Sequence, residues 1–177
     1  GIELIAGGLI IGTVIGAWLA IRVEMTGMPE LVALFNGFGG GASALVGFSE
    51  VLDRISSDGV PEAGVELYAT WIAIGLSGLV GWLTLTGSLM AMGKLMGGFY
   101  IPFTKKDDRG RRKWINFPTW GPPWLNYVKG LLLISSIALI VMTIQEPTNK
   151  EYVYYLVGTS SLLGVLFVLP IGGADMP

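Results

Sequence analysis

An asparagine lies in an otherwise apolar, glycine-rich run of this chain. The run reads M-P-E-L-V-A-L-F-N-G-F-G-G-G-A-S-A-L-V-G, and the asparagine is Asn36. A polar side chain at membrane depth is costly and usually faces protein, water or a transport path. Gly39, Gly40 and Ser43 follow at offsets of three, four and seven, so on a helix they share its face. Two interpretations stay open: an inter-helix hydrogen bond worth roughly 0.6–2 kcal/mol, or a part in a transport path.

A series of hydroxyl side chains occupies a later apolar run. Thr70, Ser77, Thr84 and Ser88 are spaced by seven, seven and four residues, which places them in one stripe of a helix. Hydroxyls in membrane helices often bond back to their own backbone carbonyls, and that is the simpler interpretation. A stripe of hydroxyls that meets an asparagine is also what a water-filled half-channel needs. The candidates for such a path are Asn36, Ser43, Ser77, Thr84 and Ser88.

The composition is that of a membrane protein. Of the 177 residues, 52% are hydrophobic and only 14% are charged, whereas soluble domains carry roughly 25% charged residues. Apolar runs of about 20 residues, long enough to cross a bilayer, recur along the chain. Cysteine is absent, which excludes disulfides and cysteine-ligated metals. Histidine is absent too, so the side chain that titrates most readily near neutral pH is missing.

These runs predict an all-α integral membrane protein, a polytopic bundle of about five transmembrane helices. The expected spans are 4–21, 29–48, 67–92, 123–144 and 152–169. Two links, 50–66 and 94–122, are long and hydrophilic, and the others are short. The chain opens without methionine inside an apolar run and stops after a Gly-Gly turn. We therefore expect residues 1–177 to be a transmembrane domain fragment of a larger protein, with no nucleotide-binding domain and no nucleic-acid partner.

The glycine pattern of the second run resembles a dinucleotide fingerprint only superficially. Gly37, Gly39 and Ala42 give G-x-G-x-x-A, but that fingerprint needs a preceding strand and a helix N-terminus. Inside a membrane span these residues are expected to be helix contacts. In the first run Gly8, Gly12, Gly16 and Ala20 recur at every fourth position, which predicts a flat surface for another helix.

Lysine and arginine are distributed unequally between the two sides of the predicted bundle. Under the five-helix topology Arg54 and Lys150 fall on one side, and the other nine of the 11 basic residues fall on the opposite side. Because basic residues are enriched in cytoplasmic loops, the basic link 94–122 is predicted to be cytoplasmic. The acidic link 50–66 is then predicted to face outward.

The chain ends in I-G-G-A-D-M-P, where Asp175 is the carboxylate at the cytoplasmic end of the fifth predicted helix. The paired Gly172 and Gly173 permit a tight bend before it. One interpretation is that the chain re-enters another helix here, with a function for the carboxylate. The alternative is that Asp175 is only the N-cap of that helix.

Three segments carry a resemblance to a known family. They read V-E-M-T-G-M-P-E-L-V-A-L-F (Val23–Phe35), T-L-T-G-S-L-M-A-M-G-K-L (Thr84–Leu95) and I-G-G-A-D-M-P (Ile171–Pro177). With them the sequence closely resembles the membrane domain of the beta subunit of proton-translocating NAD(P) transhydrogenase, outside the loop 99–121. The resemblance implies hydride transfer between NAD(H) and NADP(H) in two soluble domains, coupled to proton conduction through the membrane domain.

The resemblance also implies what lies around these residues. At least one helix is expected before Gly1, and further helices and the NADP(H)-binding domain after Pro177. These residues themselves are then expected to bind no cofactor. The implied partners are the lipid membrane, alpha subunits and the missing NADP(H)-binding domain, in a homodimeric complex of the bacterial plasma (inner) membrane.

Roles for individual residues follow from the same resemblance. Asn36 occupies the position where some family members have a histidine assigned to the proton pathway. Glu30 and Asp175, with Gly172 and Gly173, match positions implicated in coupling near the cytoplasmic face. An amide cannot take up a proton near neutral pH, so the titrating group is expected on another helix or subunit. Two rival hypotheses are a structural membrane anchor and a small-solute transporter whose site lies among Asn36, Thr84 and Ser88.

Overall fold

The computed structural model describes residues 1–56, 65–97, 99–100, 114–115, 119–146 and 149–172. Within these ranges five helices are long and apolar enough to cross a membrane. The prediction of an all-α polytopic bundle is therefore confirmed. The helices are α1 (Ile2–Arg22), α2 (Met28–Ser56), α3 (Val65–Leu95), α4 (Leu125–Gln145) and α5 (Lys150–Val168), with a 3-10 turn η1 (Met25–Gly27) before α2.

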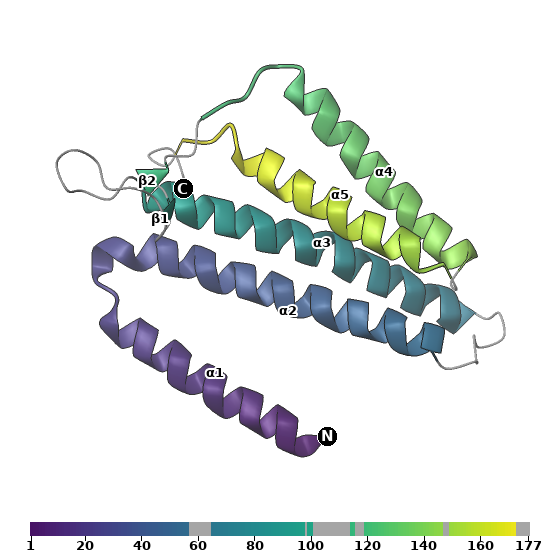
Figure 1. Ribbon diagram of the computed structural model, residues 1–177, viewed down its shortest axis with the longest axis horizontal. Helices are drawn as coiled ribbons and strands as arrows, with labels where there is room; N and C mark the ends of the chain where they lie inside the picture. Colours follow the sequence, from purple (N-terminus) through teal and green to yellow (C-terminus); the bar gives the residue numbers. More distant parts are fainter. Residues whose placement is uncertain (57–64, 98, 101–113, 116–118, 147–148, 173–177) are drawn as a thin grey trace.

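The helices alternate in direction and form a layered bundle around α3 (Figure 1). Helix α3 lies antiparallel to α2 on one side and parallel to α5 on the other, and α4 packs mainly on α5. One end of the bundle gathers the start of α2 and α4 with the ends of α3 and α5. This alternation agrees with the topology that the sequence predicts.

The apolar core lies where α2, α3, α4 and α5 meet. Val51, Trp71 and Val153 form one buried cluster, one residue from each of α2, α3 and α5. A second cluster, Leu79, Ile140 and Leu156, joins α3, α4 and α5. Lipid is as apolar as these side chains, so the hydrophobic effect does not drive the helices together. Close van der Waals packing between the helices stabilises such a core instead.

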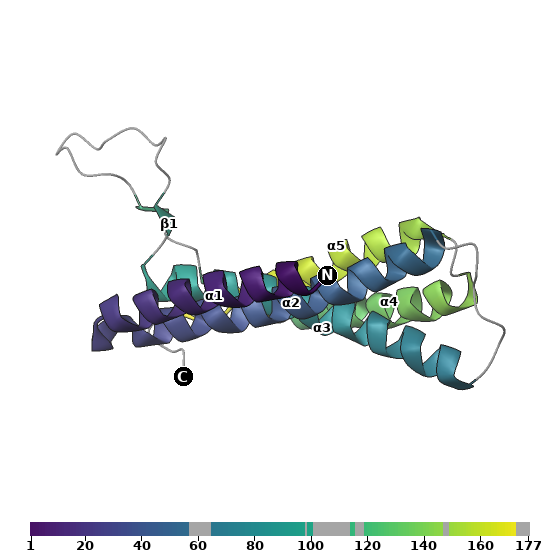
Figure 2. The same ribbon diagram turned by 90° about the horizontal axis from the view of Figure 1, so that it is seen from below.

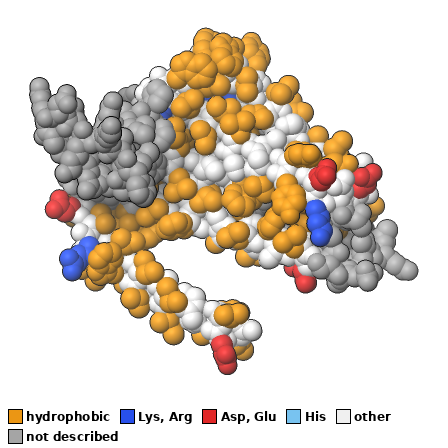
Figure 3. Space-filling view, in the orientation of Figure 1, with side chains coloured by type: hydrophobic (Ala, Val, Ile, Leu, Met, Phe, Trp, Pro, Cys, Tyr) orange, Lys and Arg blue, Asp and Glu red, His pale blue; other side chains and the backbone are white. Residues whose placement is uncertain are grey.

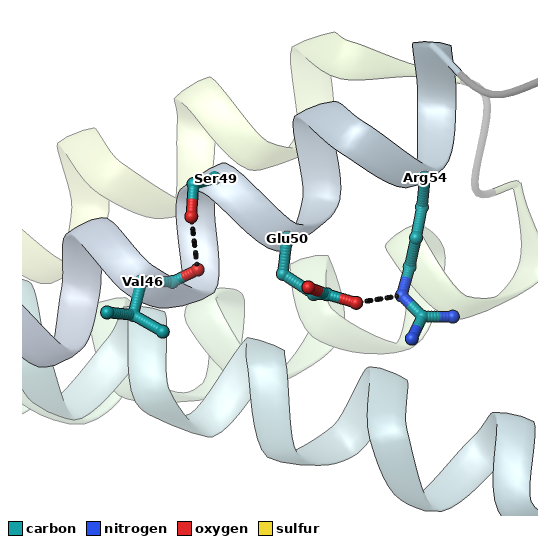
Figure 4. A network of polar contacts seen from close by, with 4 residues as sticks. All are labelled: Val46, Ser49, Glu50 and Arg54. Atoms are coloured by element: carbon teal, nitrogen blue, oxygen red, sulfur yellow. Dashed lines mark hydrogen bonds and ion pairs between the residues drawn. The ribbon is translucent and has the colours of Figure 1, made fainter. Parts of the chain in front are cut away.

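Helix α2 is longer than the sequence predicts. It continues for about two turns beyond the expected end at Phe48, to Ser56, so the first part of the link expected at 50–66 is helical. Figure 4 shows the polar contacts of these turns: Arg54 Nε donates to Glu50 Oε1 over 2.7 Å, and Ser49 Oγ donates to the carbonyl of Val46 over 2.9 Å. A glutamate four residues before an arginine stabilises a helix. The expected end at Phe48 rests on hydropathy alone and does not take this spacing into account.

The ion pair between Glu50 and Arg54 is expected to contribute little. The Glu50 side chain is 45% exposed, and such i, i+4 pairs contribute about 0.3–0.5 kcal/mol. Glu50→Gln should therefore lower the free energy of unfolding by no more than about 0.5 kcal/mol, measured by denaturant titration in detergent micelles. A loss several times larger would show that the outer turns of α2 depend on this pair.

Helix α1 stands apart from the rest of the bundle (Figure 1) and has no buried residue. Figure 3 shows hydrophobic side chains along it. A Cβ built on Gly8, Gly12 or Gly16 meets nothing within 4 Å. The small-residue surface expected on this helix therefore faces no other helix of the described chain, and its packing role stays a prediction.

Two short strands occur within the long link between α3 and α4. Strands β1 (Phe99–Tyr100) and β2 (Trp114–Ile115) pair antiparallel, with Phe99 opposite Ile115. Figure 2 shows β1 to one side of the helices. The sequence predicts only a hydrophilic link here, because two-residue strands are too short to produce an alternating pattern.

Candidate functional site

The predicted polar residues meet along the seam between α2 and α3. Asn36 Nδ2 donates to Ser88 Oγ over 2.9 Å, across 52 residues of sequence. Ser88 is 9% exposed, whereas Asn36 is exposed in this chain. The seam therefore presents its buried hydroxyl to an amide that remains accessible.

A second polar pair lies further along the same seam. Ser43 Oγ and Ser77 Oγ are 2.8 Å apart, and Ser77 Oγ donates to the carbonyl of Ser43 over 2.9 Å. A hydroxyl has one proton to donate. Because Ser77 gives its proton to the carbonyl, Ser43 must be the donor between the two hydroxyls. The pair is therefore fully ordered, and its direction runs from α2 to α3.

Glycines bring the two helices into close contact between these polar pairs. A Cβ built on Gly40 would lie 2.7 Å from Thr84 Cβ, and one on Gly81 would lie 2.7 Å from both Ala44 Cβ and the carbonyl oxygen of Gly40. Ala44 is 0% exposed. A site that cannot accept one carbon has no room for water. The seam is dry between the pairs, so a continuous file of water cannot run through it.

Access to the polar groups is from the flank of the seam. Asn36 and Ser43 are both exposed in this chain, and they lie on the same face of α2. Gly39 lies on that side as well, and a Cβ on it would meet nothing within 4 Å. The two neighbouring glycines therefore have different surroundings. Gly40 lies in the contact between the helices, and Gly39 lies on a flat, open flank beside Asn36.

The predicted hydroxyl stripe of α3 faces α2. Ser77 and Ser88 bond across to α2 instead of to their own helix, and Thr84 packs on Gly40. Hydroxyls elsewhere follow the simpler expectation: Ser135 Oγ donates to the carbonyl of Leu132, and Thr143 Oγ1 to the carbonyl of Leu139. Asn36 contacts the hydroxyl stripe at Ser88; a role in proton transfer stays a prediction.

The predicted coupling residues are only partly described. Glu30 lies in the first turn of α2, beside the 3-10 turn, where a Cβ on Gly27 would be 3.4 Å from Glu30 Oε2. Gly172 is the last described residue after α5. Gly173 and Asp175 lie outside the described residues, so their predicted roles stay predictions.

One charged residue that the sequence analysis did not select belongs to this region. Lys94 is 8% exposed, and its Nζ donates to the carbonyls of Val168, Leu169 and Ile171 at the end of α5. From the sequence, Lys94 is expected only to be one of the basic residues on the predicted cytoplasmic side. Lys94 lies inside the last turn of α3 and not after it. That position in the sequence could have indicated a lysine that contacts a neighbouring helix.

The residues of the superficial fingerprint do not fit a nucleotide. Gly37, Gly39 and Ala42 lie within α2, where backbone N–H groups are used by the helix and cannot surround a pyrophosphate. Among the described residues no group of three or more His, Cys, Asp or Glu side chains could hold a metal ion. The described side chains of this site can donate and accept hydrogen bonds.

The fold and the site define an integral membrane protein, a helical bundle with hydrogen-bonded polar pairs at one helix seam. Comparison with known proteins identifies the family within this class. The family model of the NAD(P) transhydrogenase beta subunit matches residues 1–177, and the chain belongs to this family. The match includes the loop 99–121, which the segments that carried the resemblance had left out.

Curated relatives agree with the family match. The chain is similar to two proteins named NAD(P) transhydrogenase subunit beta, both from Rhodospirillum rubrum and one of them from a specified strain. With each it is 33% identical over 167 residues, which cover 94% of this chain and 32% of the relative. The chain thus spans about a third of the length of the curated relatives it matches.

Proposed function

We propose that this chain is part of the proton-conducting membrane domain of an NAD(P) transhydrogenase, in which proton movement is coupled to hydride transfer between NAD(H) and NADP(H). The observation that carries the proposal is the pair of Asn36 and Ser88, an amide held by a buried hydroxyl at the open flank of a membrane helix seam. Membership of the NAD(P) transhydrogenase beta subunit family supports the assignment of this reaction. Hydride transfer itself is assigned to nucleotide-binding domains elsewhere in the complex.

In this proposal Asn36 orients the group that donates the proton, and its hydrogen bond to Ser88 supports that part. Ser88 accepts a hydrogen bond from the amide nitrogen, and within the described chain no donor occupies Oδ1. This oxygen is therefore available to water or to a protonated side chain on the open flank. Because an amide does not titrate near neutral pH, Asn36 orients the proton donor, and the titrating group belongs to another helix or subunit.

Two alternatives are less consistent with the arrangement. A solute site among Asn36, Thr84 and Ser88 would need a cavity, but Thr84 lies in the closest helix contact of the seam. Two cavities lie elsewhere, one lined mainly by apolar side chains around Trp71 and one in the groove between α4 and α5. A purely structural anchor would not require an exposed asparagine held by a buried serine.

The remaining features of the complex follow the same proposal. The end of the bundle that holds the start of α2 and the end of α5 would face the cytoplasm with the basic link 94–122. Alpha subunits and an NADP(H)-binding domain would adjoin that end. The complex would be a homodimer in the bacterial inner membrane.

Ser88→Ala tests this proposal in the full complex. Without the hydroxyl, Asn36 loses its acceptor, and a lost hydrogen bond of about 1 kcal/mol corresponds to roughly a fivefold loss of rate. We expect proton-coupled hydride transfer in sealed vesicles to fall by about that factor, while hydride exchange between bound nucleotides without a proton gradient persists.

Ser135→Ala is the matched control, because the Ser135 hydroxyl bonds to a carbonyl of its own helix. It should leave both rates unchanged. Equal coupled rates for Ser88→Ala and wild type would remove the hydrogen-bonded pair from the conduction path. Reconstitution with purified complex excludes differences in expression.

A further inference from the structure

The end of α5 is held by a buried cation from α3. Lys94 Nζ lies 3.0 Å from the carbonyl oxygen of Val168, 2.5 Å from that of Leu169 and 2.7 Å from that of Ile171. An ammonium group has three protons to donate, so all of them have acceptors. At 8% exposure the side chain is ordered and shielded.

The sequence explains why carbonyls are available at this point. Pro170 follows the C-cap residue Leu169 of α5 and has no N–H group, so it cannot continue the helix hydrogen bonds. The last carbonyls of a helix lack intrahelical partners and carry the negative end of the helix dipole. A cation there is favourable, and within the described chain no carboxylate pairs with Lys94. The carbonyls thus take the place of a counter-ion.

Close packing of α3 on α5 sets the lysine at this position. A Cβ built on Gly87 would lie 3.3 Å from the carbonyl oxygen of Gly164. Thr86 Oγ1 donates to the carbonyl of Ser161 over 2.8 Å. The two parallel helices therefore cannot slide independently near this end, and Lys94 continues their contact past the last turn of α5.

The same helix carries the proposed conduction site. Ser88 and Lys94 are six residues apart on α3, about 9 Å along its axis at the usual helical rise. One end of this short helical segment holds Asn36 of α2, and the other holds the chain at Ile171, next to Gly172. The residue that accepts from Asn36 and the residue that binds the end of α5 thus lie on one continuous helical segment.

We propose that Lys94 is a positioning residue that fixes the end of α5 and the direction in which the chain leaves it at Pro170–Gly172. Its further role, which rests on the proposed function, is to transmit changes at the Asn36–Ser88 pair to that exit. Lys94 touches neither the proton path nor a nucleotide; it acts through the backbone of α5.

Lys94→Met is the decisive variant, because methionine has similar length and leaves no unpaired buried charge. The described chain offers a probe position at Ile171, whose side chain is 40% exposed. A nitroxide on Ile171→Cys in the full complex, with other cysteines replaced, reports local motion by its electron paramagnetic resonance spectrum; the chain itself contains no cysteine.

In the Lys94→Met background we expect the Ile171 label to become more mobile and the proton-coupled rate to fall about tenfold, as for loss of a hydrogen bond to a charged group. Lys94→Arg keeps the charge and should restore most of both. Lys129→Met is the matched control: Lys129 lies 5.6 Å from the Phe167 ring, so it contacts a side chain of α5 instead of its carbonyls. It should change neither readout.

An unchanged label spectrum in Lys94→Met would overturn the positioning role. A mobile label with a wild-type coupled rate would overturn the transmission role, provided that Ser88→Ala lowers that rate. If Ser88→Ala leaves the rate unchanged, the proposed function fails by itself, and the label still decides whether Lys94 positions the end of α5.

Discussion

Replacing Asn36 with leucine in the full complex is expected to lower proton-coupled hydride transfer by at least about tenfold, more than loss of Ser88. The reason is that leucine removes both ends of the amide: the donor to Ser88 and the oxygen available to the flank. Ser88 is then left as a buried hydroxyl without this partner, which costs about 1–3 kcal/mol, or roughly 5- to 160-fold in rate if lost from the transition state.

The measurement compares two rates in the same vesicles. One is hydride transfer driven by an imposed proton gradient, and the other is hydride exchange among nucleotides without a gradient. Loss of the first with retention of the second places the defect in the membrane domain. Loss of both together would instead indicate a misassembled complex.

Phe38→Leu is the matched control for Asn36→Leu. Phe38 is on the same helix and is 57% exposed, but two residues further it points about 200° away from Asn36. It should leave the coupled rate at the wild-type level. If Asn36→Leu is indistinguishable from Phe38→Leu, the conduit proposal is wrong and the structural anchor becomes the better hypothesis.

Gly81→Leu is expected to separate α2 from α3 and to have the largest effect on stability. Its first side-chain carbon alone would lie 2.7 Å from Ala44 Cβ and from the carbonyl oxygen of Gly40, and backbone cannot move aside as a flexible side chain can. Overpacking of a close contact costs about 1–3 kcal/mol, occasionally more. With the polar pairs on either side also pulled apart, we expect a loss of about 3 kcal/mol or more.

Denaturant titration of the purified complex, followed by circular dichroism, measures this loss. Gly130→Leu is the control, since a Cβ on Gly130 of α4 meets nothing within 4 Å. It should unfold close to the wild-type midpoint. Equal midpoints for the two leucine variants would show that the seam is looser than the glycine contacts indicate.

The sequence predicted the helices because their apolar runs have the length of a bilayer. It also predicted that the hydroxyls of α3 lie in one stripe, since positions at helical spacing share a face whatever the tertiary structure. It failed at the end of α2, where the helix continues through hydrophilic residues to Ser56. There hydropathy and helix propensity disagree, and propensity prevails outside the apolar core.

The candidate site was predictable in its residues but not in its pairing. Asn36 could have met Thr84 as well as Ser88 on the same stripe. The choice depends on the relative height of two helices, which the contact of Gly40 with Thr84 and of Gly81 with Ala44 fixes. Such contacts involve residues far apart in the chain, so a local sequence pattern does not predict them.

By itself the sequence determined that this is a membrane bundle, that about five runs are long enough to cross a bilayer, and which helix faces carry polar groups. These properties depend on composition and helical period, which are local. Only the tertiary structure decided that the seam is dry between its two polar pairs, that Asn36 is reached from the flank, and that Lys94 holds the end of α5. Each of these depends on how closely two backbones approach, and that distance is set jointly by both helices.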